Sequence, residues 1–412
     1  MNVRMSRSPD EVEAMQRPDW RWQMSNRITS LERLQEFLPG FTPTAEQIAV
    51  SKRYPFAVTP YYASLIERAD VSDPIYQMAV PQAAEGIDAP ELIRDPLGEH
   101  QHSPVPGLLH RYPDRAVLLL NGLCPVYCRH CTRKRFVGIE KGAASDEKIT
   151  LWADYLRKHP EIKDVILSGG DPLTMSNRRL ERVLEAVRSV ESVEIIRIGT
   201  RIPVLMPMRI TPELCELLDR YAPVWVVTHF NHPREVTPLA AEACERLVRA
   251  GVPVNNQSVL LRGVNDHPDI MESLCRSLMR NRIRPYYLHQ SDIIQGIEHL
   301  RTRTSRGVEI MEALRGRLGG LAIPLYVLDL PEGGGKVPIL PQYIVSQSPH
   351  KTVLRNFEGR LVSYPEPAQL DSPLDTLQRV QRGGIADQLS GVRPKALIPQ
   401  GYKKPHERGE DD

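Results

Sequence analysis

Residues 116–135 read AVLLLNGLCPVYCRHCTRKR and place Cys124, Cys128 and Cys131 directly after an apolar run. On a loop leaving a buried strand, this C-x3-C-x2-C spacing can bind three irons of a cubane cluster and leave the fourth iron open to a small molecule. Zinc is the first alternative, but closed structural zinc sites need four ligands, and His130 stands awkwardly between two cysteines. A disulfide would leave one thiol over, and three merely structural cysteines explain this density poorly. The stretch favours an iron–sulfur loop.

The composition is that of an ordinary globular protein with an ample core, since 41% of the 412 residues are hydrophobic and 25% are charged. A formal net charge of +2 gives no electrostatic argument for binding nucleic acid or an anionic membrane. We see no apolar stretch of bilayer length and no apolar core of a signal peptide, and therefore expect a cytoplasmic protein. The remaining cysteines, Cys215, Cys244 and Cys275, lie in helical apolar patterns and are interpreted as small buried hydrophobic residues.

From about residue 115 to 330, β-branched runs alternate with amphipathic helices, which is typical of parallel βαβ units. We expect strands at 116–121, 163–168, 193–198, 223–229, 252–260, 283–288 and 322–328, and helices near 146–158, 178–190, 211–220, 237–250, 268–280 and 305–317. Six or seven such units predict an α/β fold, a partial (β/α)6-type barrel resembling a TIM barrel, with function in the loops at the carboxyl ends of the strands.

The flanking regions differ from this pattern. Residues 1–110 show mainly helix signals and are interpreted as an N-terminal helical arm that packs on the main domain or on another subunit. The barrel is assigned to residues 111–345, and residues 346–412 form a C-terminal extension with a short hairpin near 354–359. The last part of this extension is rich in Pro, Gly and charge, and we expect it to be disordered.

Nearly every unusual residue of the barrel follows a predicted strand, which indicates one shared site. The segment Ser168-Gly169-Gly170-Asp171 offers backbone N–H groups and a carboxylate to a ligand, although a capped turn explains it equally well. His229 and His232 follow the fourth strand, where they can bind a metal with a third ligand, hydrogen-bond a ligand, or simply pack. Gln257 lies in the fifth strand.

The stretch from Gly333 to Lys336 is the second strong motif. A lysine on a glycine loop can contact phosphate or form a Schiff base with an aldehyde cofactor, and a flexible turn is the alternative. The G-x4-G-K-[ST] spacing of a Walker loop is missing. Asp292 and Asp329 end the last two strands, where carboxylates can act as acid and base, bind a metal or hold a cation. Arg111 and Arg115 precede the first strand, and arginine forks suit phosphate or carboxylate.

The cysteine spacing, with Tyr127 before the second cysteine, resembles the motif of radical S-adenosylmethionine (radical SAM) enzymes. Longer stretches resemble the lysine 2,3-aminomutase family, namely Cys128–Phe136, His229–Pro233, Asn256–Asn265 and Gly333–Pro338, and the resemblance runs from about Asp19 to Gly359. It implies a [4Fe–4S] cluster on Cys124, Cys128 and Cys131, whose open iron chelates S-adenosylmethionine. It also implies an external reductant of the flavodoxin or ferredoxin type, whose electron cleaves S-adenosylmethionine to a 5′-deoxyadenosyl radical.

The resemblance further implies the roles of the remaining site residues. In the family, the lysine matching Lys336 holds pyridoxal 5′-phosphate and then yields it to the α-amine of the substrate. The radical takes a hydrogen atom from the β-carbon, and the nitrogen migrates from C2 to C3. The other implied contacts are Arg133 with the substrate carboxylate, Asp292 and Asp329 with the side-chain ammonium, Arg111 and Arg115 with the cofactor phosphate, and Ser168, Gly169, Gly170, Asp171, His229 and Gln257 with S-adenosylmethionine.

The implied enzyme is therefore an isomerase that converts L-lysine to β-lysine, because buried carboxylates require a cation and disfavour an acidic substrate. L-Arginine is the alternative, since a guanidinium fork pairs well with two carboxylates. A radical enzyme acting on RNA or protein would have no use for Lys336, and a non-catalytic iron–sulfur redox protein would need a fourth ligand. Typical members also carry a zinc site, but here His267 replaces one cysteine and none follows Cys275, so we expect no structural zinc. By analogy we expect a homo-oligomer.

Overall fold

The structure, a computed structural model, describes residues 9–16, 18–87, 89–139 and 142–368. The chain divides into two compact units, Met1–Gln342 and Tyr343–Asp412. The disordered end that the sequence predicts lies outside the described residues. Among those residues, no helix is long and apolar enough to cross a membrane.

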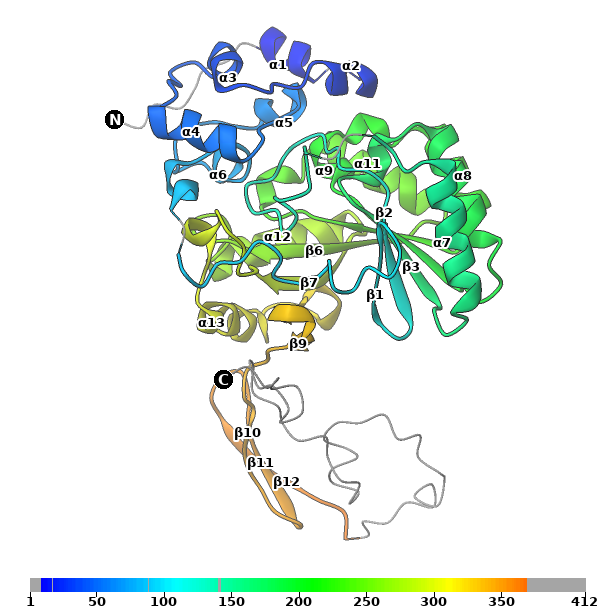
Figure 1. Ribbon diagram of the computed structural model, residues 1–412. Coiled ribbons are helices and arrows are strands. Elements are labelled where there is room, and N and C mark those ends of the chain that lie inside the picture. The colour runs from blue at the N-terminus through cyan, green and yellow to red at the C-terminus, as the bar shows by residue number, and fades with distance from the viewer. Residues whose placement is uncertain (1–8, 17, 88, 140–141, 369–412) are drawn as a thin grey trace, which may run out of the picture. The chain divides into compact units, whose positions relative to one another are not determined.

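Short helices make up the N-terminal part of the first unit (Figure 1). Their boundaries follow local capping chemistry, as at Thr44, which forms a reciprocal capping box with Gln47. Asp73 similarly accepts the backbone N–H groups of Ile75 and Tyr76. The elements are α1 (Pro9–Met15), α2 (Trp20–Ser25), α3 (Leu31–Phe37), α4 (Ala45–Arg53), α5 (Pro60–Ser64), α6 (Pro74–Ala79) and the 3-10 turn η1 (Ala83–Gly86).

Within the described residues, a curled sheet of nine strands forms the centre of the first unit, in the spatial order β1 to β9 (Figure 1). Strands β2 to β8 run parallel, whereas β1 and β9 are antiparallel to their neighbours. The strands are β1 (Leu108–Tyr112), β2 (Arg115–Leu119), β3 (Asp164–Ser168), β4 (Ile195–Gly199), β5 (Val224–Thr228), β6 (Val254–Leu260), β7 (Arg284–Gln290), β8 (Leu325–Leu330) and β9 (Gly335–Pro338).

Helices connect the parallel strands and lie on the outer side of the curled sheet (Figure 1). They are α7 (Asp146–Lys158), α8 (Asn177–Arg188), α9 (Ile202–Leu205), α10 (Pro212–Arg220), α11 (Pro238–Arg249), α12 (Pro268–Arg280) and α13 (Thr304–Leu314). The predicted boundaries of the seven parallel strands and their six main crossover helices agree with the described ones within three residues. The predicted fold class, a partial barrel of the TIM type, is confirmed.

The alternation of buried and half-buried residues explains how the sheet presents a site. In β2, Ala116 and Leu118 are buried under the helices, whereas Arg115 and Val117 line the inner face. Strands β3 and β4 repeat this pattern, since successive side chains of a strand point to opposite faces. The outer residues therefore build the core, and the inner residues are left to form a cavity.

Two strands of this sheet were not expected from the sequence. Residues 108–112, which span the predicted limit between the helical arm and the barrel, form β1, whose register with β2 shifts between Leu109 and Tyr112. The glycine motif continues into β9, where Lys336 pairs with Asp329 of β8. Both strands are short, and neither carries a long β-branched run that would have marked it.

In the second unit, the described residues form a three-stranded antiparallel sheet of β10 (Ile344–Gln347), β11 (Lys351–Arg355) and β12 (Leu361–Pro365). The β11–β12 pair forms the short hairpin that the sequence predicts near 354–359.

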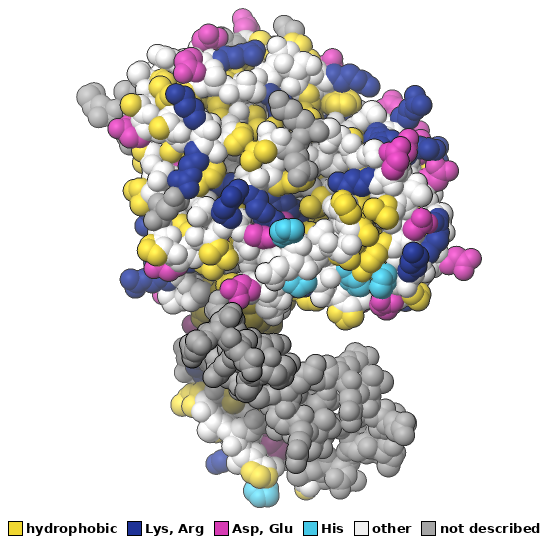
Figure 2. Space-filling model, in the orientation of Figure 1, with side chains coloured by type: hydrophobic (Ala, Val, Ile, Leu, Met, Phe, Trp, Pro, Cys, Tyr) yellow, Lys and Arg dark blue, Asp and Glu magenta, His cyan; other side chains and the backbone are white. Residues whose placement is uncertain are grey.

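On the face visible in Figure 2, basic and acidic side chains are interspersed, as a net charge near zero leads one to expect.

Candidate active site

The cysteine loop follows β2 and is held by the N-terminal helices. The backbone N–H of Tyr127 donates to Ala57 O at 2.9 Å, and that of Arg129 donates to Met78 O at 2.9 Å. The guanidinium of Arg129, 1% exposed, also pairs with Glu85 of η1 at 2.6 Å. These contacts fix the loop between the barrel and the helices, so its cysteines have defined positions.

The three predicted cluster ligands lie half-buried on this loop. Burial, followed by repulsion from Asp171 and the other two cysteines, holds the pKa of Cys124 well above its usual range. Burial and the neighbouring Cys128 raise the pKa of Cys131 to about 11. Three thiolates would therefore repel one another unless a cation joins them, which fits a site for iron. Among the described residues no group of three His, Cys, Asp or Glu side chains is placed to hold a single metal ion, and a cubane needs no such group because each cysteine binds a different iron.

Gly169 and Gly170 pack against the backbone of the cysteine loop. A Cβ atom on Gly169 would lie 2.5 Å from Asn121 O, and one on Gly170 would overlap Leu123 O. The close approach that we predicted for a ligand is thus made by the loop itself. The carboxylate of Asp171 is similarly engaged, because it accepts hydrogen bonds from the Thr200 hydroxyl and the Arg201 backbone N–H, both at 2.7 Å.

Two other residues predicted to contact S-adenosylmethionine, His229 and Gln257, contact each other. The Gln257 amide lies 2.9 Å from His229 Nε2. Burial, followed by the charge of Arg201, lowers the pKa of His229 to about 3, so the imidazole is neutral and accepts this bond. Gln257 also lines the large cavity of the barrel.

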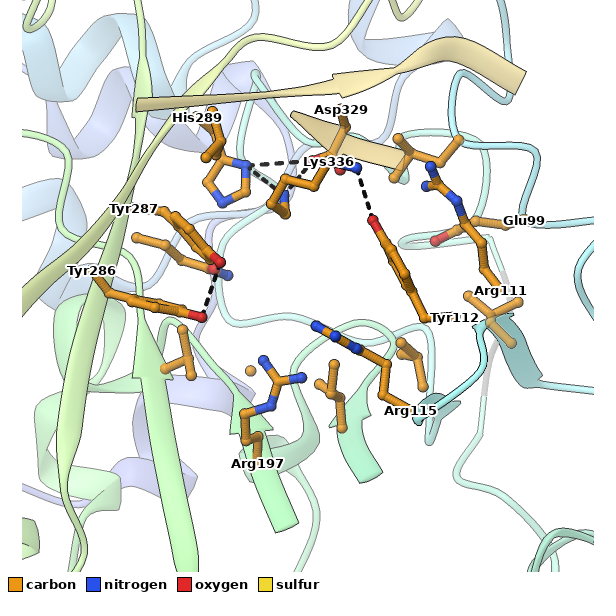
Figure 3. A pocket seen from close by; sticks show the side chains of 18 of the residues that line it. Glu99, Arg111, Tyr112, Arg115, Arg197, Tyr286, Tyr287, His289, Asp329 and Lys336 are labelled. Atoms are coloured by element: carbon orange, nitrogen blue, oxygen red, sulfur yellow. Dashed lines mark hydrogen bonds and ion pairs between the residues drawn. The ribbon is translucent and has the colours of Figure 1, made fainter. Parts of the chain in front are cut away.

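This cavity has a volume of about 450 Å³ and brings together residues from the first and the last strands of the sheet (Figure 3). Figure 3 shows Lys336, Asp329 and His289 at one side and Arg115 and Arg197 at the other. Its lining includes the predicted residues Arg111, Arg115, Arg133, Gln257, Asp329 and Lys336, with Glu99, Tyr112, Arg197, Tyr286, Tyr287 and His289 in addition.

Lys336 is held at the cavity by the β8–β9 pairing. Its Nζ donates to Asp329 Oδ2 at 2.6 Å and lies 3.2 Å from His289 Nδ1, while its backbone N–H donates to the Tyr112 hydroxyl at 2.8 Å. Burial alone would raise the pKa of Asp329, but bonds to His289 and Lys336 outweigh it and hold that pKa well below its usual range. Burial lowers the pKa of His289. The lysine therefore faces one ionised carboxylate and one neutral imidazole.

The predicted phosphate ligands differ in their contacts. Arg111 donates from Nε to Gly333 O at 2.9 Å, and its buried Nη2 has no hydrogen-bond partner among the described residues. Such an orphaned guanidinium nitrogen fits an anion in the cavity. Arg115 instead pairs with the neighbouring Asp114 at 2.9 Å, and its guanidinium lies 4.8 Å from the centre of the Tyr112 ring.

Arg133 lies between the two predicted cofactor regions. Its Nε donates to Glu99 Oε1 at 2.8 Å, and its Nη1 donates to the Ser168 hydroxyl at 3.1 Å. The structure therefore brings together Ser168, predicted to contact S-adenosylmethionine, and Arg133, predicted to bind the substrate carboxylate. Glu99 is only 7% exposed, so this pair is fixed at the wall of the cavity.

Asp292 borders a second cavity, of about 710 Å³, which it shares with Asp329. The Thr132 hydroxyl donates to Asp292 Oδ2 at 2.7 Å. Burial, together with the charge of Asp329, raises the pKa of Asp292 to about 6, against the hydrogen bond from Thr132, which lowers it. Two half-buried carboxylates that repel one another are stabilised by a cation.

Comparison with known proteins gives two family models that match the chain, the radical SAM superfamily over residues 119–274 and the lysine 2,3-aminomutase model over residues 311–408. An L-lysine 2,3-aminomutase from Fusobacterium nucleatum is 49% identical over 85% of this chain and 82% of its own length. Another, from Clostridium subterminale, is 46% identical over 94% of both chains. The chain belongs to the lysine 2,3-aminomutase family.

Members of the lysine 2,3-aminomutase family are isomerases, so the predicted enzyme class is confirmed. The radical SAM match over residues 119–274 implies S-adenosylmethionine and a [4Fe–4S] cluster as cofactors, and the aminomutase family implies an amino acid as substrate. A glutamate 2,3-aminomutase from Clostridioides difficile is also 41% identical, over 86% of this chain and 84% of that protein. The solved structure of a radical SAM methyltransferase from Sphaerobacter thermophilus matches at a TM-score of 0.39 and 20% identity, over 54% of this chain and 68% of that one.

Sequence reasoning missed several residues of this aminomutase site. His289 and Tyr287 stand on β7 and Glu99 precedes β1, where a single polar residue carries no motif. Arg201 follows β4, and its Nη1 lies 2.9 Å from Cys128 Sγ. Strand alternation could have indicated His289, because it points inward like Tyr287. Arg201 gave no comparable signal.

Proposed function

We propose that this chain is a radical SAM, pyridoxal phosphate-dependent 2,3-aminomutase that converts L-lysine to β-lysine. The observation that supports it best is the arrangement of Lys336 and Arg111 in one cavity. A lysine paired with Asp329 at 2.6 Å faces a cavity that Arg111 also lines, and the buried Nη2 of this arginine has no partner in the described chain. A covalent anchor for an aldehyde and a donor for its phosphate are the two requirements of this cofactor.

The same residues fit the chemistry of both cofactors. When bound, the reduced cluster and S-adenosylmethionine supply a radical that can take hydrogen from an unactivated carbon, and pyridoxal phosphate supplies an aldehyde and a π-system that spreads an unpaired electron. Cys124, Cys128 and Cys131 would hold the cluster. Ser168, Gly169, Gly170, Asp171, His229 and Gln257 would shape the S-adenosylmethionine site, with Asp171 and the glycines acting through the loop that they fix.

The carboxylate of Asp329 already has a cationic partner. In the structure that cation is the ammonium of Lys336. When Lys336 is engaged by the cofactor it no longer offers this charge, and the carboxylate becomes a partner for the ammonium of the substrate. Asp292, on the adjoining cavity, would hold the same ammonium from a second side, and Arg133 would orient the substrate carboxylate.

The neutral His289 supports proton movement at this lysine. His289 Nδ1 lies 3.2 Å from Lys336 Nζ and 3.5 Å from Asp329 Oδ2, so the imidazole is within reach of both groups. The imidazole can therefore take a proton when Lys336 must act as a nucleophile. Apolar residues on the inner wall, such as Val117 and Val327, would limit the access of water.

L-Arginine is the second candidate substrate. The carboxylates of Asp292 and Asp329 both border the 710 Å³ cavity, which leaves space beyond them for a guanidinium. An acidic substrate is disfavoured, because it would bring a third carboxylate to this pair.

We further propose a flavodoxin- or ferredoxin-type reductant. Four expectations stay predictions: a homo-oligomer, a cytoplasmic location, the domain limits 1–110, 111–345 and 346–412, and the absence of structural zinc.

The test is to reconstitute the cluster without oxygen, add pyridoxal phosphate, S-adenosylmethionine and a reductant, and offer L-lysine, L-arginine or L-glutamate. We expect β-lysine; β-arginine as the main product would favour the second candidate. Lys336→Ala should abolish the visible absorbance of bound pyridoxal phosphate while sparing the iron, and Cys128→Ser should do the reverse. The exposed Lys158→Ala and the buried Cys244→Ser serve as matched controls. No β-amino acid from any substrate, with no pyridoxal absorbance, would refute the proposal.

A further inference from the structure

Arg201, which follows β4, brings a buried positive charge to one cysteine of the loop. Its side chain is 8% exposed, and its Nη1 lies 2.9 Å from Cys128 Sγ. The Sγ of Cys131 accepts a neutral donor instead, the backbone N–H of Arg133, at 3.3 Å. The sulfurs of the loop therefore differ in their surroundings.

The guanidinium of Arg201 is fixed by contacts on its other side. Its Nε donates to His229 O at 2.9 Å, and its Nη2 pairs with Glu235 Oε1 at 2.5 Å. Glu235 is completely buried, and the Tyr62 hydroxyl of α5 donates to the same oxygen at 2.6 Å. The second oxygen of Glu235 accepts the backbone N–H groups of residues 231 and 232. Arg201 thus has little freedom to move away from the sulfur.

A fixed charge beside a cluster ligand affects electron transfer. Adding one electron from an external reductant makes the cluster and its sulfurs more negative, and a hydrogen-bonded cation stabilises that form. The carboxylate of Glu235 acts in the opposite direction, because it partly cancels the charge of Arg201. Both effects are strengthened by burial, since little water screens them.

We propose that Arg201 raises the reduction potential of the cluster through its hydrogen bond to Cys128, and that Glu235 limits this effect. The inference rests on the proposed ligation of the cluster by the three cysteines and goes beyond it by assigning a tuning function to this buried pair. If the Arg201–Glu235 pair only supported the fold, loss of either residue would lower the cluster content. The two losses would not move the reduction potential of the cluster in opposite directions.

The test is a redox titration of the reconstituted full-length protein with dithionite and mediators, monitored by electron paramagnetic resonance in the absence of amino acid substrate. Arg201→Gln should shift the midpoint potential to a more negative value, and Arg201→Lys, which keeps the charge but loses the fork, should shift it less. Glu235→Gln should shift it to a less negative value. Arg209→Gln is the control, because this buried arginine donates to the backbone carbonyls of Leu173 and Met175.

Unchanged potentials in the Arg201 and Glu235 variants, or shifts in the same direction, would overturn the inference. If Arg201→Gln does not retain iron, the opposite shifts of Arg201→Lys and Glu235→Gln decide the question. An unmodified protein that takes up no cluster would refute the proposed function together with the inference. A cluster that shows the opposite shifts in a protein making no β-amino acid would refute the proposed function alone.

Discussion

Replacing Glu85 by glutamine should destabilise the fold by about 3 kcal/mol and weaken retention of the cluster. Glu85 is completely buried, and its carboxylate pairs with Arg129 at 2.6 Å and with Lys134 at 2.8 Å. These two cations flank Cys131 in the sequence, so one carboxylate from η1 fixes both sides of the cysteine loop. Glutamine keeps the shape of the side chain but removes the charge that both cations require.

The magnitude follows from the titration of this carboxyl group. Burial alone would raise the pKa of Glu85, but the charges of Arg129 and Lys134 outweigh it and lower the pKa from 4.5 to about 2. At about 1.4 kcal/mol per pH unit, the difference corresponds to roughly 3 kcal/mol of stability for the ionised form. Removing one partner of a buried ion pair costs about 3–5 kcal/mol in general, which agrees.

The assay is urea unfolding at pH 7, followed by tryptophan fluorescence, together with iron content after desalting. Because the pKa is depressed in the folded state, the contribution is present above pH 4.5 and is lost as the pH falls toward about 2. The gap between the wild-type protein and Glu85→Gln should therefore narrow over that range. Glu181→Gln, which breaks an exposed pair with Arg220, should cost less than about 1 kcal/mol. An equally small effect at Glu85, with full iron content, would refute the reasoning.

Two further predictions concern the cavity. Because burial raises the pKa of Asp292 to about 6, kcat/KM for L-lysine should fall about tenfold per pH unit below that value. Asp292→Asn should lower kcat/KM roughly 10–100-fold and remove this dependence, and an unchanged pH profile would contradict the assignment. Gly333 has φ +81°, and a Cβ there would overlap the ring of His102. Gly333→Ala should therefore weaken pyridoxal phosphate binding about tenfold in a spectroscopic titration, whereas Gly319→Ala, where the space is open, should not.

The sequence was informative where chemistry coincides with a regular element. Helix α7 spans the residues 146–158 that its amphipathic pattern predicts, and the cysteine spacing indicated its own chemistry. Pairing across the sheet was not predictable from the same signals. Lys336 could be assigned to a glycine loop, but only the β8–β9 register shows that Asp329 lies opposite it and pairs with its ammonium.

Isolated polar residues were the other limit, because one polar side chain in a strand or loop carries no pattern. Glu99 belongs to the wall of the cavity, yet nothing in its neighbours distinguishes it from a surface residue. The glycines after β3 showed the opposite problem. Their small size was recognised, but the group that approaches Gly169 closely is the backbone of Asn121.

The N-terminal helices are part of the active site in physical terms, although they contribute none of the predicted cofactor ligands. Arg27 donates to Cys124 O at 2.7 Å, Glu85 pairs with the cations on both sides of Cys131, and Tyr62 donates to the carboxylate that binds Arg201. Without these helices, Arg129 and Lys134 would lose their buried partner Glu85, at a cost of several kcal/mol. The barrel alone could then keep its sheet but not the geometry of the loop. Docking of the helices and assembly of the cluster should therefore be coupled, because the helices fix the loop that carries the three cysteines.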